Sequence, residues 1–170
     1  MLWPRLLQLT STSRTMTTSA KVPTIRLASA QDERAVEALL TANHLPLDGV
    51  HEALSCFVVA EDGGDIVGVA GIEACGVEGE HALLRSVAVS ADWRSRGLGR
   101  ALVARAIALA EERGAKALYL LTTTAESYFP SFGFTQTTRD AVPGDVSATA
   151  EFKGACPASA IVMVRPSARA

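Results

Sequence analysis

The sequence has few cysteines, no excess of positive charge and no long apolar run. Its 3 cysteines, Cys56, Cys75 and Cys156, are far apart, and none forms a Cys-x-x-Cys pair. This spacing argues against a disulfide scaffold or a metal site and favours a reducing, cytoplasmic location. Lys and Arg number 16 against 18 for Asp and Glu, so no basic surface predicts nucleic-acid binding. No apolar run reaches the roughly 18 residues that span a bilayer, so no membrane partner is expected.

What remains is the composition of one globular domain. The chain has 170 residues, of which 48% are hydrophobic and 20% charged, which is enough to build a core. Residues 1–20 differ, because they are rich in Ser and Thr and the first acidic residue is Asp32. We expect them to be a disordered or mis-started extension, with Met16 as a second candidate start and a transit peptide as the alternative. The domain is expected at 22–166, followed by a tail at 167–170.

Hydrophobic periodicity predicts an α/β fold around a mixed, mostly antiparallel sheet flanked by helices. Strands are predicted at residues 24–27, 56–60, 66–74, 81–89, 117–121 and 159–164, with one more after Phe134. Helices are predicted after Ser29, from a cap at Asp48 to Leu54, from Leu98 toward Gly114, and over 125–131, with a helical turn at 145–152. The long helix connects the strands at 81–89 and 117–121, so these two should be parallel.

The clearest chemical signal follows the strand at 81–89. It reads Arg94-Ser95-Arg96-Gly97-Leu98-Gly99-Arg100, so an Arg-x-x-Gly-x-Gly pattern opens the long helix. The first amides of a helix lack internal partners, and the helix dipole adds about half a positive charge there. Gly97 and Gly99 carry no side chains, so a phosphate can approach the backbone. The pattern predicts a pyrophosphate site, while the lack of a third glycine and of Gly-Lys-Ser/Thr argues against Rossmann and Walker sites.

These residues resemble the acetyl-CoA pyrophosphate loop, Arg/Gln-x-x-Gly-x-Gly/Ala, of the GNAT N-acetyltransferase superfamily. Residues 125–134 are similar to its second signature, Ala-x-x-Phe-Tyr-x-x-x-Gly-Phe, and the likeness covers residues 24–164. The resemblance implies a GNAT-like fold, acetyl-CoA as co-substrate and direct attack of a substrate amine on the thioester. It implies that the strand end Val87-Ala88-Val89 holds the pantetheine arm, that residues 94–100 hold the pyrophosphate and that Tyr128 lies at the cofactor. Homodimers are common among such relatives, although no motif here requires one.

Two positions depart from the family pattern. The tyrosine that often protonates the leaving thiolate should be residue 129, which is Phe129. Tyr128 is adjacent, but a helix would turn its side chain about 100° away, which favours a packing role. A glutamate that some members carry early in the fourth strand is replaced by Leu83. Glu73 is then the nearest candidate for the general base, through a water molecule, unless it is an exposed acid without a role; His81 is a second candidate.

Arg85 is a cation within an apolar strand. Period two places it on one face with Val87 and Val89, which would point it at the acetyl group. A buried arginine needs a partner. It either pairs with an internal acid such as Glu73 or binds a carboxylate, phosphinate or arsinate of the substrate. Arg85 and Glu73 are therefore the predicted catalytic and substrate-binding residues.

The segment Cys156-Pro157-Ala158-Ser159-Ala160 resembles the Cys-Pro-x-Ser-Ala ending of a GNAT branch encoded in arsenic-resistance gene clusters, as do residues 43–48. The resemblance implies acetylation of a small, anionic, amino-acid-like amine, with arsenical detoxification as one role. Cys156 is then either inert packing or a soft ligand for trivalent arsenic. Two alternatives stay open. One is acetylation of a protein N-terminus or lysine, and the other is an acyl-CoA-binding sensor without activity, which Leu83 and Phe129 favour.

Overall fold

The computed structural model describes residues 21–168; the extension expected at 1–20 and the last two residues of the expected tail lie outside this range. Seven strands of the described chain form one sheet in the order β1-β2-β3-β4-β5-β7-β6. They are β1 (Thr24–Leu27), β2 (Phe57–Asp62), β3 (Asp65–Cys75), β4 (His81–Val89), β5 (Ala117–Thr122), β6 (Thr135–Thr137) and β7 (Ile161–Pro166). The β4–β5 pairing is parallel, and the other pairings are antiparallel. The predicted mixed α/β sheet is confirmed.

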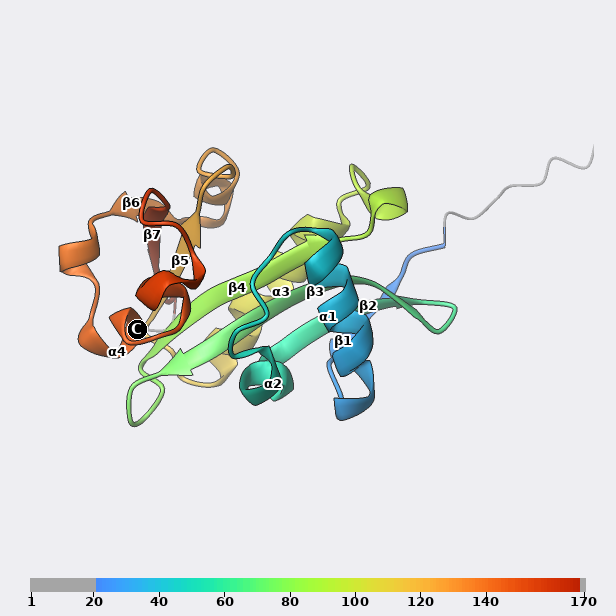
Figure 1. Ribbon diagram of the computed structural model, residues 1–170, viewed down its shortest axis with the longest axis horizontal. Helices are drawn as coiled ribbons and strands as arrows, with labels where there is room; N and C mark the ends of the chain where they lie inside the picture. The colour runs from blue at the N-terminus through green and yellow to red at the C-terminus, as the bar shows by residue number, and fades with distance from the viewer. Residues whose placement is uncertain (1–20, 169–170) are drawn as a thin grey trace, which may run out of the picture.

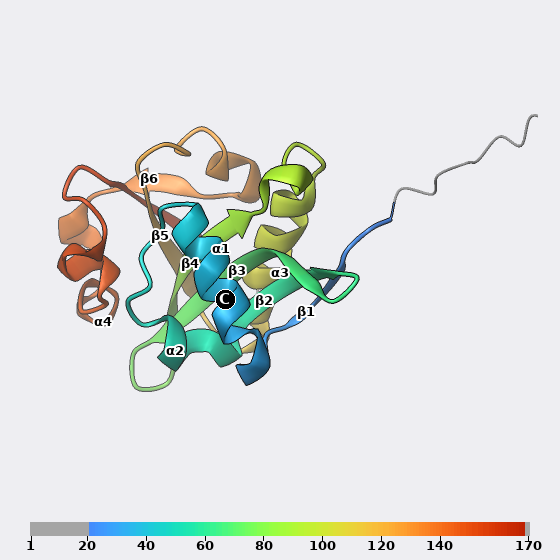
Figure 2. The ribbon, with the colours of Figure 1, turned by 45° about the vertical axis from the view of Figure 1, so that its right-hand side comes forward.

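Helices cover both faces of this sheet. They are α1 (Glu33–Ala42), α2 (Val50–Ala53), α3 (Leu98–Glu112) and the short α4 (Gly144–Ser147). In Figure 1, α1 and α2 lie in front of the sheet and α3 lies behind it, and Figure 2 shows the same layers from the side. Each helix layer buries its own apolar cluster against the strands. No helix among residues 21–168 is long and apolar enough to cross a membrane.

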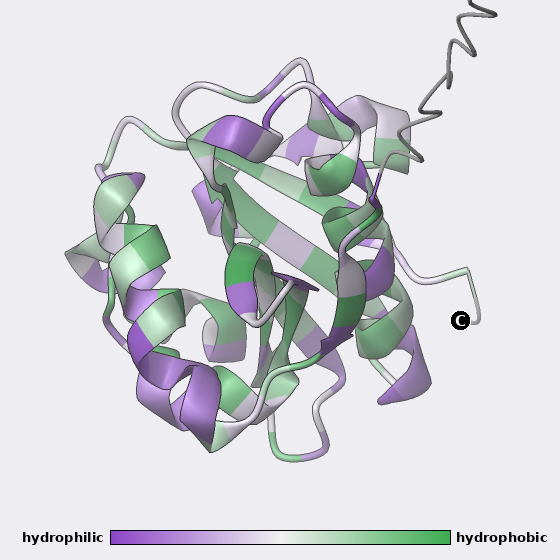
Figure 3. Ribbon diagram, turned by 90° about the vertical axis from the view of Figure 1, so that its right-hand side faces the viewer, coloured by the Kyte–Doolittle hydropathy of each residue, from purple (hydrophilic) through white to green (hydrophobic). Residues whose placement is uncertain are grey.

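The hydropathy of the chain follows these layers. In Figure 3 the central strands are mostly hydrophobic, whereas the helices beside them change between hydrophobic and hydrophilic along their length. In α3 the buried positions include Leu98, Leu102, Ala106 and Leu109, which recur at the spacing of one helix face. Helix α3 therefore forms on an amphipathic pattern and is held by packing on the sheet. This fixes the position of its N-terminus at the end of β4.

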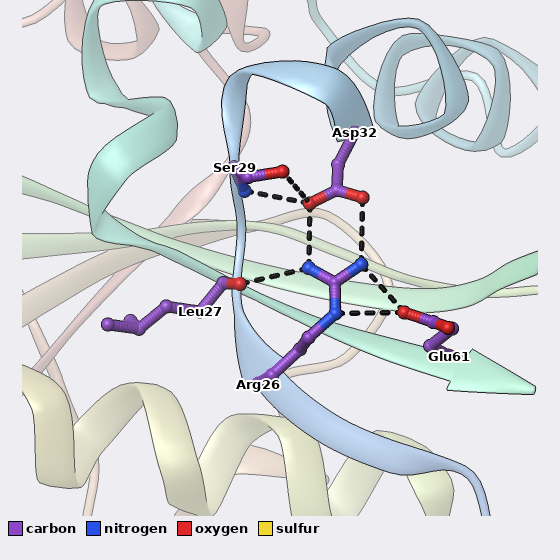
Figure 4. Close-up of polar contacts among 5 residues, drawn as sticks. All are labelled: Arg26, Leu27, Ser29, Asp32 and Glu61. Carbon is purple, nitrogen blue, oxygen red and sulfur yellow. Dashed lines mark hydrogen bonds and ion pairs between the residues drawn. The ribbon is translucent and has the colours of Figure 1, made fainter. Parts of the chain in front are cut away.

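An ion-pair network joins β1, β2 and the start of α1 (Figure 4). The Arg26 guanidinium donates to both oxygens of Asp32, at 2.7 and 2.9 Å, and its Nε donates to Glu61 at 2.9 Å. Asp32 also accepts from the amide and the hydroxyl of Ser29. The Arg26 guanidinium therefore holds the pKa of Asp32 far below its usual range, although burial acts against it. The network stabilises an edge strand that has few apolar contacts of its own.

Two local predictions were wrong. Asp48 does not cap the short helix α2, which begins at Val50 after Gly49 in the left-handed region (φ 74°), and Asp48 instead offers its carbonyl to Arg85. The helix expected at 125–131 is a turn followed by a 3-10 helix over Phe129–Phe132. Pro130 has no backbone amide, so it fits the first turn of a helix but not the interior of a longer one.

A bulge in β4 overturns the expected face of Arg85. Gly71 is the register partner of Arg85 and Val69 that of Ala88, so Ser86 and Val87 together stand opposite one residue of β3. Ser86 has φ 56°, the left-handed region that side chains other than glycine rarely adopt. Val87 therefore turns toward the α3 face with Val89, while Arg85 points to the other face of the sheet. The expectation that the three residues share a face was wrong, because period two does not continue through a bulge.

We expect Asp32→Asn to lower the free energy of unfolding by about 1–3 kcal/mol at neutral pH, because it removes a buried charge that accepts several hydrogen bonds. The folded-state pKa of Asp32 is depressed, so its contribution is full above the unfolded pKa of about 4 and is lost as pH falls toward the folded value. Urea unfolding near neutral pH and in acid should show the difference between wild type and variant shrinking in acid. Asp92→Asn changes an exposed acid and is the control; equal stabilities of the two variants would contradict the assignment.

Candidate active site

A cavity opens where β4 and β5 separate. Their backbone pairing is confined to His81–Leu83 on β4 and Ala117–Tyr119 on β5. Beyond it lies a cavity of about 840 Å³, lined by residues 84–87 of β4, 120–122 of β5, residues 123–125, 128 and 129 after β5, and parts of the loops at 44–48 and 151–160. Gly99, in the first turn of α3, also lines it. The cavity therefore reaches from the helix that carries the glycine motif into the widened gap of the sheet.

The predicted anion site lies at the N-terminus of α3. Gly97 precedes the helix in the left-handed region (φ 80°), as does Ser95 (φ 61°). The Ala101 amide donates to the Gly97 carbonyl at 3.1 Å, and the helix geometry leaves the amides of Leu98, Gly99 and Arg100 without an intrahelical acceptor. A Cβ at Gly97 would have no heavy atom within 4 Å, so the space beside this turn is open. The turn fits a pyrophosphate, which needs free amides and room for its oxygens.

Three arginines surround this turn in different ways. Arg94 donates to the Val89 carbonyl at 3.2 Å and to Asn43 at 2.9 Å, so it ties the loop to the end of β4 and to α1. Arg96 lies over the Trp93 ring. Arg100 donates to Ser131 at 3.0 Å and lies over the Phe132 ring. Their charges add to the field of the helix dipole. The structure thus places every residue of the predicted motif at or beside the first turn of α3.

Tyr128 and Phe129 both line the cavity, and Phe129 is also packed in the core. The Tyr128 side chain comes within 3.8 Å of a Cβ built at Gly99, and the residue is 38% exposed. Burial raises the pKa of its hydroxyl, so the phenol keeps its proton at neutral pH. Phe129 is 8% exposed and meets the Phe134 ring edge to face. Because the segment is a turn and not an α-helix, the rotation expected between the two aromatic residues does not separate Tyr128 from the cavity.

A buried charge cluster surrounds Arg85. Its side chain has no exposed area, and its Nη1 donates to Glu73 at 2.8 Å. Its Nε lies 3.2 Å from the Ser86 hydroxyl and 3.3 Å from Glu151. The structure thus brings the predicted pair Arg85 and Glu73 together, but Arg85 lines the cavity and Glu73 does not. Glu73 on β3 lies diagonally opposite Arg85 on β4, since the register partner of Glu73 is Leu83.

Sequence reasoning missed Glu151 as a site residue, although a helical turn was predicted at 145–152. It lies in the turn Glu151–Ala155 that follows α4, and its side chain is 6% exposed. In Figures 1 and 2 this C-terminal part of the chain lies at the β5 side of the sheet. No local pattern marks Glu151, because its partners lie 66 and 78 residues earlier at Arg85 and Glu73. Only the folded chain brings this acid to the gap between β4 and β5.

His81 lies away from the cavity wall. It begins β4 and pairs with Asp145 at 2.8 Å. Within residues 21–168, donor atoms of Glu80, His81 and Asp145 lie within 4.8 Å of one another, which is the one grouping there with the spacing of a metal site. None of the three lines the cavity. Direct proton transfer from an amine in the cavity to His81 therefore has no geometric support.

Comparisons with known proteins agree with this geometry. The family profile described as Acetyltransferase (GNAT) family matches residues 22–136. N-acetylglutamate synthase from Neisseria gonorrhoeae, solved with coenzyme A and N-acetyl-glutamate, aligns at 23% identity with a TM-score of 0.73, over 86% of this chain and 35% of that one. This chain thus spans about a third of the synthase.

Two Escherichia coli structures share the fold over most of both chains. One is YhbS in complex with CoA, at 21% identity and a TM-score of 0.65, covering 90% of this chain and 86% of that one. The other is the ribosomal-protein-S18-alanine N-acetyltransferase, at 22% identity and a TM-score of 0.58, covering 85% and 93%. The structural likeness establishes the fold, and the family profile covers more than half of the sequence. The chain therefore belongs to the acetyltransferase (GNAT) family.

Proposed function

We propose that this protein acetylates the primary amine of a small, anionic, amino-acid-like compound. One observation carries the proposal: a single cavity includes both Gly99, at the anion-binding turn of α3, and Arg85, in the buried charge cluster. The register places Arg85 opposite Gly71 and Val89 opposite Gly68, so at about 3.3 Å per residue of β3 Arg85 lies roughly 10 Å along β4 from its end at Val89. The volume of the cavity, about 840 Å³, is within the usual range for small-molecule sites. Donor and acceptor would therefore meet in one cavity.

The donor end follows from the backbone. The amides of the turn before and within α3 would hold the pyrophosphate, and Val87, Ala88 and Val89 would present main-chain groups to the pantetheine arm. The amine nitrogen would attack the thioester carbonyl directly. A C–N bond forms and the C–S bond breaks, and no enzyme nucleophile is acylated. Tyr128, which lines the cavity, would give its phenol proton to the departing thiolate, and burial keeps that proton in place.

The acceptor end favours an anionic amino acid. Arg85 would supply the positive charge for the acid group of the substrate, and Glu73 would orient Arg85 or act on the amine through water. Arsinate and phosphinate groups offer the same paired oxygens as a carboxylate, so arsenic-containing amino acids belong to the proposed class. Cys156 and Pro157 line the same cavity, which supports a role for this segment in substrate choice.

The first test is CoA release by purified protein supplied with acetyl-CoA and one amine at a time. The panel is arsinothricin, phosphinothricin, glutamate and aspartate, with an N-terminal peptide for comparison. We expect turnover with at least one of the four amino acids. We also expect Arg85→Lys to reduce kcat/KM at least about tenfold, because lysine keeps the charge but lacks the paired N–H donors of the guanidinium. Turnover with the peptide alone would favour a protein acetyltransferase, and a melting shift from acetyl-CoA without turnover would favour a sensor.

Gly99→Ala should weaken acetyl-CoA binding while leaving the fold intact. The added methyl group would stand 3.6 Å from Val89 and 3.8 Å from the Tyr128 hydroxyl, which is ordinary contact, and alanine favours a helix over glycine. It would fill the space through which the cofactor reaches the free amides. We expect Kd to rise at least about tenfold, a loss of roughly 1.4 kcal/mol, measured by calorimetry. Gly144→Ala, also into open space on a helix, is the control; equal Kd values would place the cofactor elsewhere.

Tyr128→Phe should lower kcat and leave the KM for acetyl-CoA nearly unchanged. The change removes only the hydroxyl, so the packing against Phe129 and Phe132 stays. Loss of a proton donor typically costs about 10²-fold or more in rate. Steady-state kinetics separate this from a binding role, in which KM alone would rise. A wild-type kcat in this variant would show that Tyr128 has a packing role and is not the proton donor.

A further inference from the structure

Glu151 is a buried carboxylate on the wall of the proposed acceptor site, and neither sequence motif includes it. Its side chain is 6% exposed, yet it lines the cavity together with Arg85 and Cys156. Glu73, the other acid of the cluster, has 25% of its side chain exposed but does not line the cavity. Glu151 is therefore the carboxylate of this cluster that an amine in the cavity meets directly.

The charges of the cluster do not balance. One guanidinium, that of Arg85, faces two carboxylates, and it holds Glu73 at 2.8 Å and Glu151 at 3.3 Å. The Cys156 thiol also donates to Glu151. Burial and Glu151 raise the pKa of this thiol to about 11, and the charges of Arg85 and Arg139 act in the opposite direction. Burial and the nearby Glu73 raise the pKa of Glu151, which Arg85 only partly offsets. A buried acid with an incomplete counter-charge is a site where a cation binds well.

The Arg85–Glu151 contact matches the two charges of an α-amino acid. Such a ligand carries an ammonium and an acid group on one carbon, and the cluster presents a cation and an anion at 3.3 Å. Arg85 uses one N–H at each of its three nitrogens for Glu73, Asp48 and Ser86. A guanidinium has five N–H bonds, so two remain for a substrate. The longest ion pair of the cluster is thus the one that a zwitterion would enter.

We propose that Glu151 receives the substrate ammonium and takes its proton before the amine attacks the thioester. The inference rests on the proposed function and names the base of that same site. One ammonium proton passes to the Glu151 carboxylate, and the neutral nitrogen forms the C–N bond. The C–S bond breaks with its electron pair on sulfur, Tyr128 gives its proton to that thiolate, and the second nitrogen proton restores the phenol of Tyr128. Arg85 holds the acid group of the substrate and positions Glu151.

The test compares wild type with Glu151→Gln, which keeps the shape of the side chain and removes its charge. We expect kcat/KM for the accepted amine to fall about 10²-fold or more and the acidic limb of its pH profile to disappear. Binding of acetyl-CoA should be unchanged, which also shows that the variant is folded. Glu78→Gln, on an exposed loop, is the matched control.

A second readout does not depend on turnover. In the CoA complex, calorimetry compares an amino acid with the 2-hydroxy acid that has oxygen in place of its amine. We expect the wild type to prefer the amino acid at least about tenfold, or 1.4 kcal/mol, and Glu151→Gln to lose that preference.

An unchanged preference and pH profile in the variant would overturn the role of Glu151. Wild-type turnover of the peptide alone would instead overturn the proposed substrate class, and Glu151→Gln would then be measured on the peptide amine. Failure of wild type to bind or acetylate any amine would overturn both.

Discussion

The site depends on one constraint, which is that β4 must leave its neighbour β5 while it stays paired to β3. The bulge at Ser86 provides this. It places two residues of β4 opposite one of β3, and Ser86 adopts the left-handed region at a cost of about 1–3 kcal/mol. Pairing with β5 has already ended at Leu83, so β4 is free to twist away. The same bulge sends Arg85 to one face of the sheet and Val87 to the other. The position of the buried cation and that of the strand end therefore have one local cause, and the gap begins just before it.

The second requirement is a buried charge that stays in place. An arginine without exposed area is costly unless its donors are paired, and here Glu73, Ser86 and the Asp48 carbonyl occupy three of its five N–H bonds. Gly49 lets the α2 segment come close, because a Cβ there would lie 3.1 Å from the Arg85 guanidinium. The cluster thus joins β3, β4, the loop before α2 and the C-terminal segment. Removing one acid would leave the remaining groups poorly paired, so its members act as a unit and their effects should not be additive.

The sequence predicted the features that depend on local pattern. Strand β4, helix α3 and the Arg94–Gly99 motif follow from periodicity and glycine placement, and the parallel pairing of β4 with β5 follows from the helix between them. What escaped prediction depends on long-range contacts. The bulge is set by the register with β3, and the role of Asp48 is set by Arg85, 37 residues later. Glu151 reaches the site only because β7 returns beside β5 and brings the preceding turn with it.

The geometry also bears on why, under the proposed function, a free amino acid would suit this site better than a peptide. Both ligands offer an amine to Glu151, but a peptide has a neutral amide where the amino acid has its acid group. The Arg85–Glu151 contact would open to admit the amine, and only the amino acid would return a negative charge to Arg85. A neutral ligand would leave a buried guanidinium with a weaker partner, which costs more than any contact with the peptide chain near this point is expected to return. Selectivity of this kind comes from the unpaired charge that the wrong ligand leaves behind, and not from the shape of the cavity.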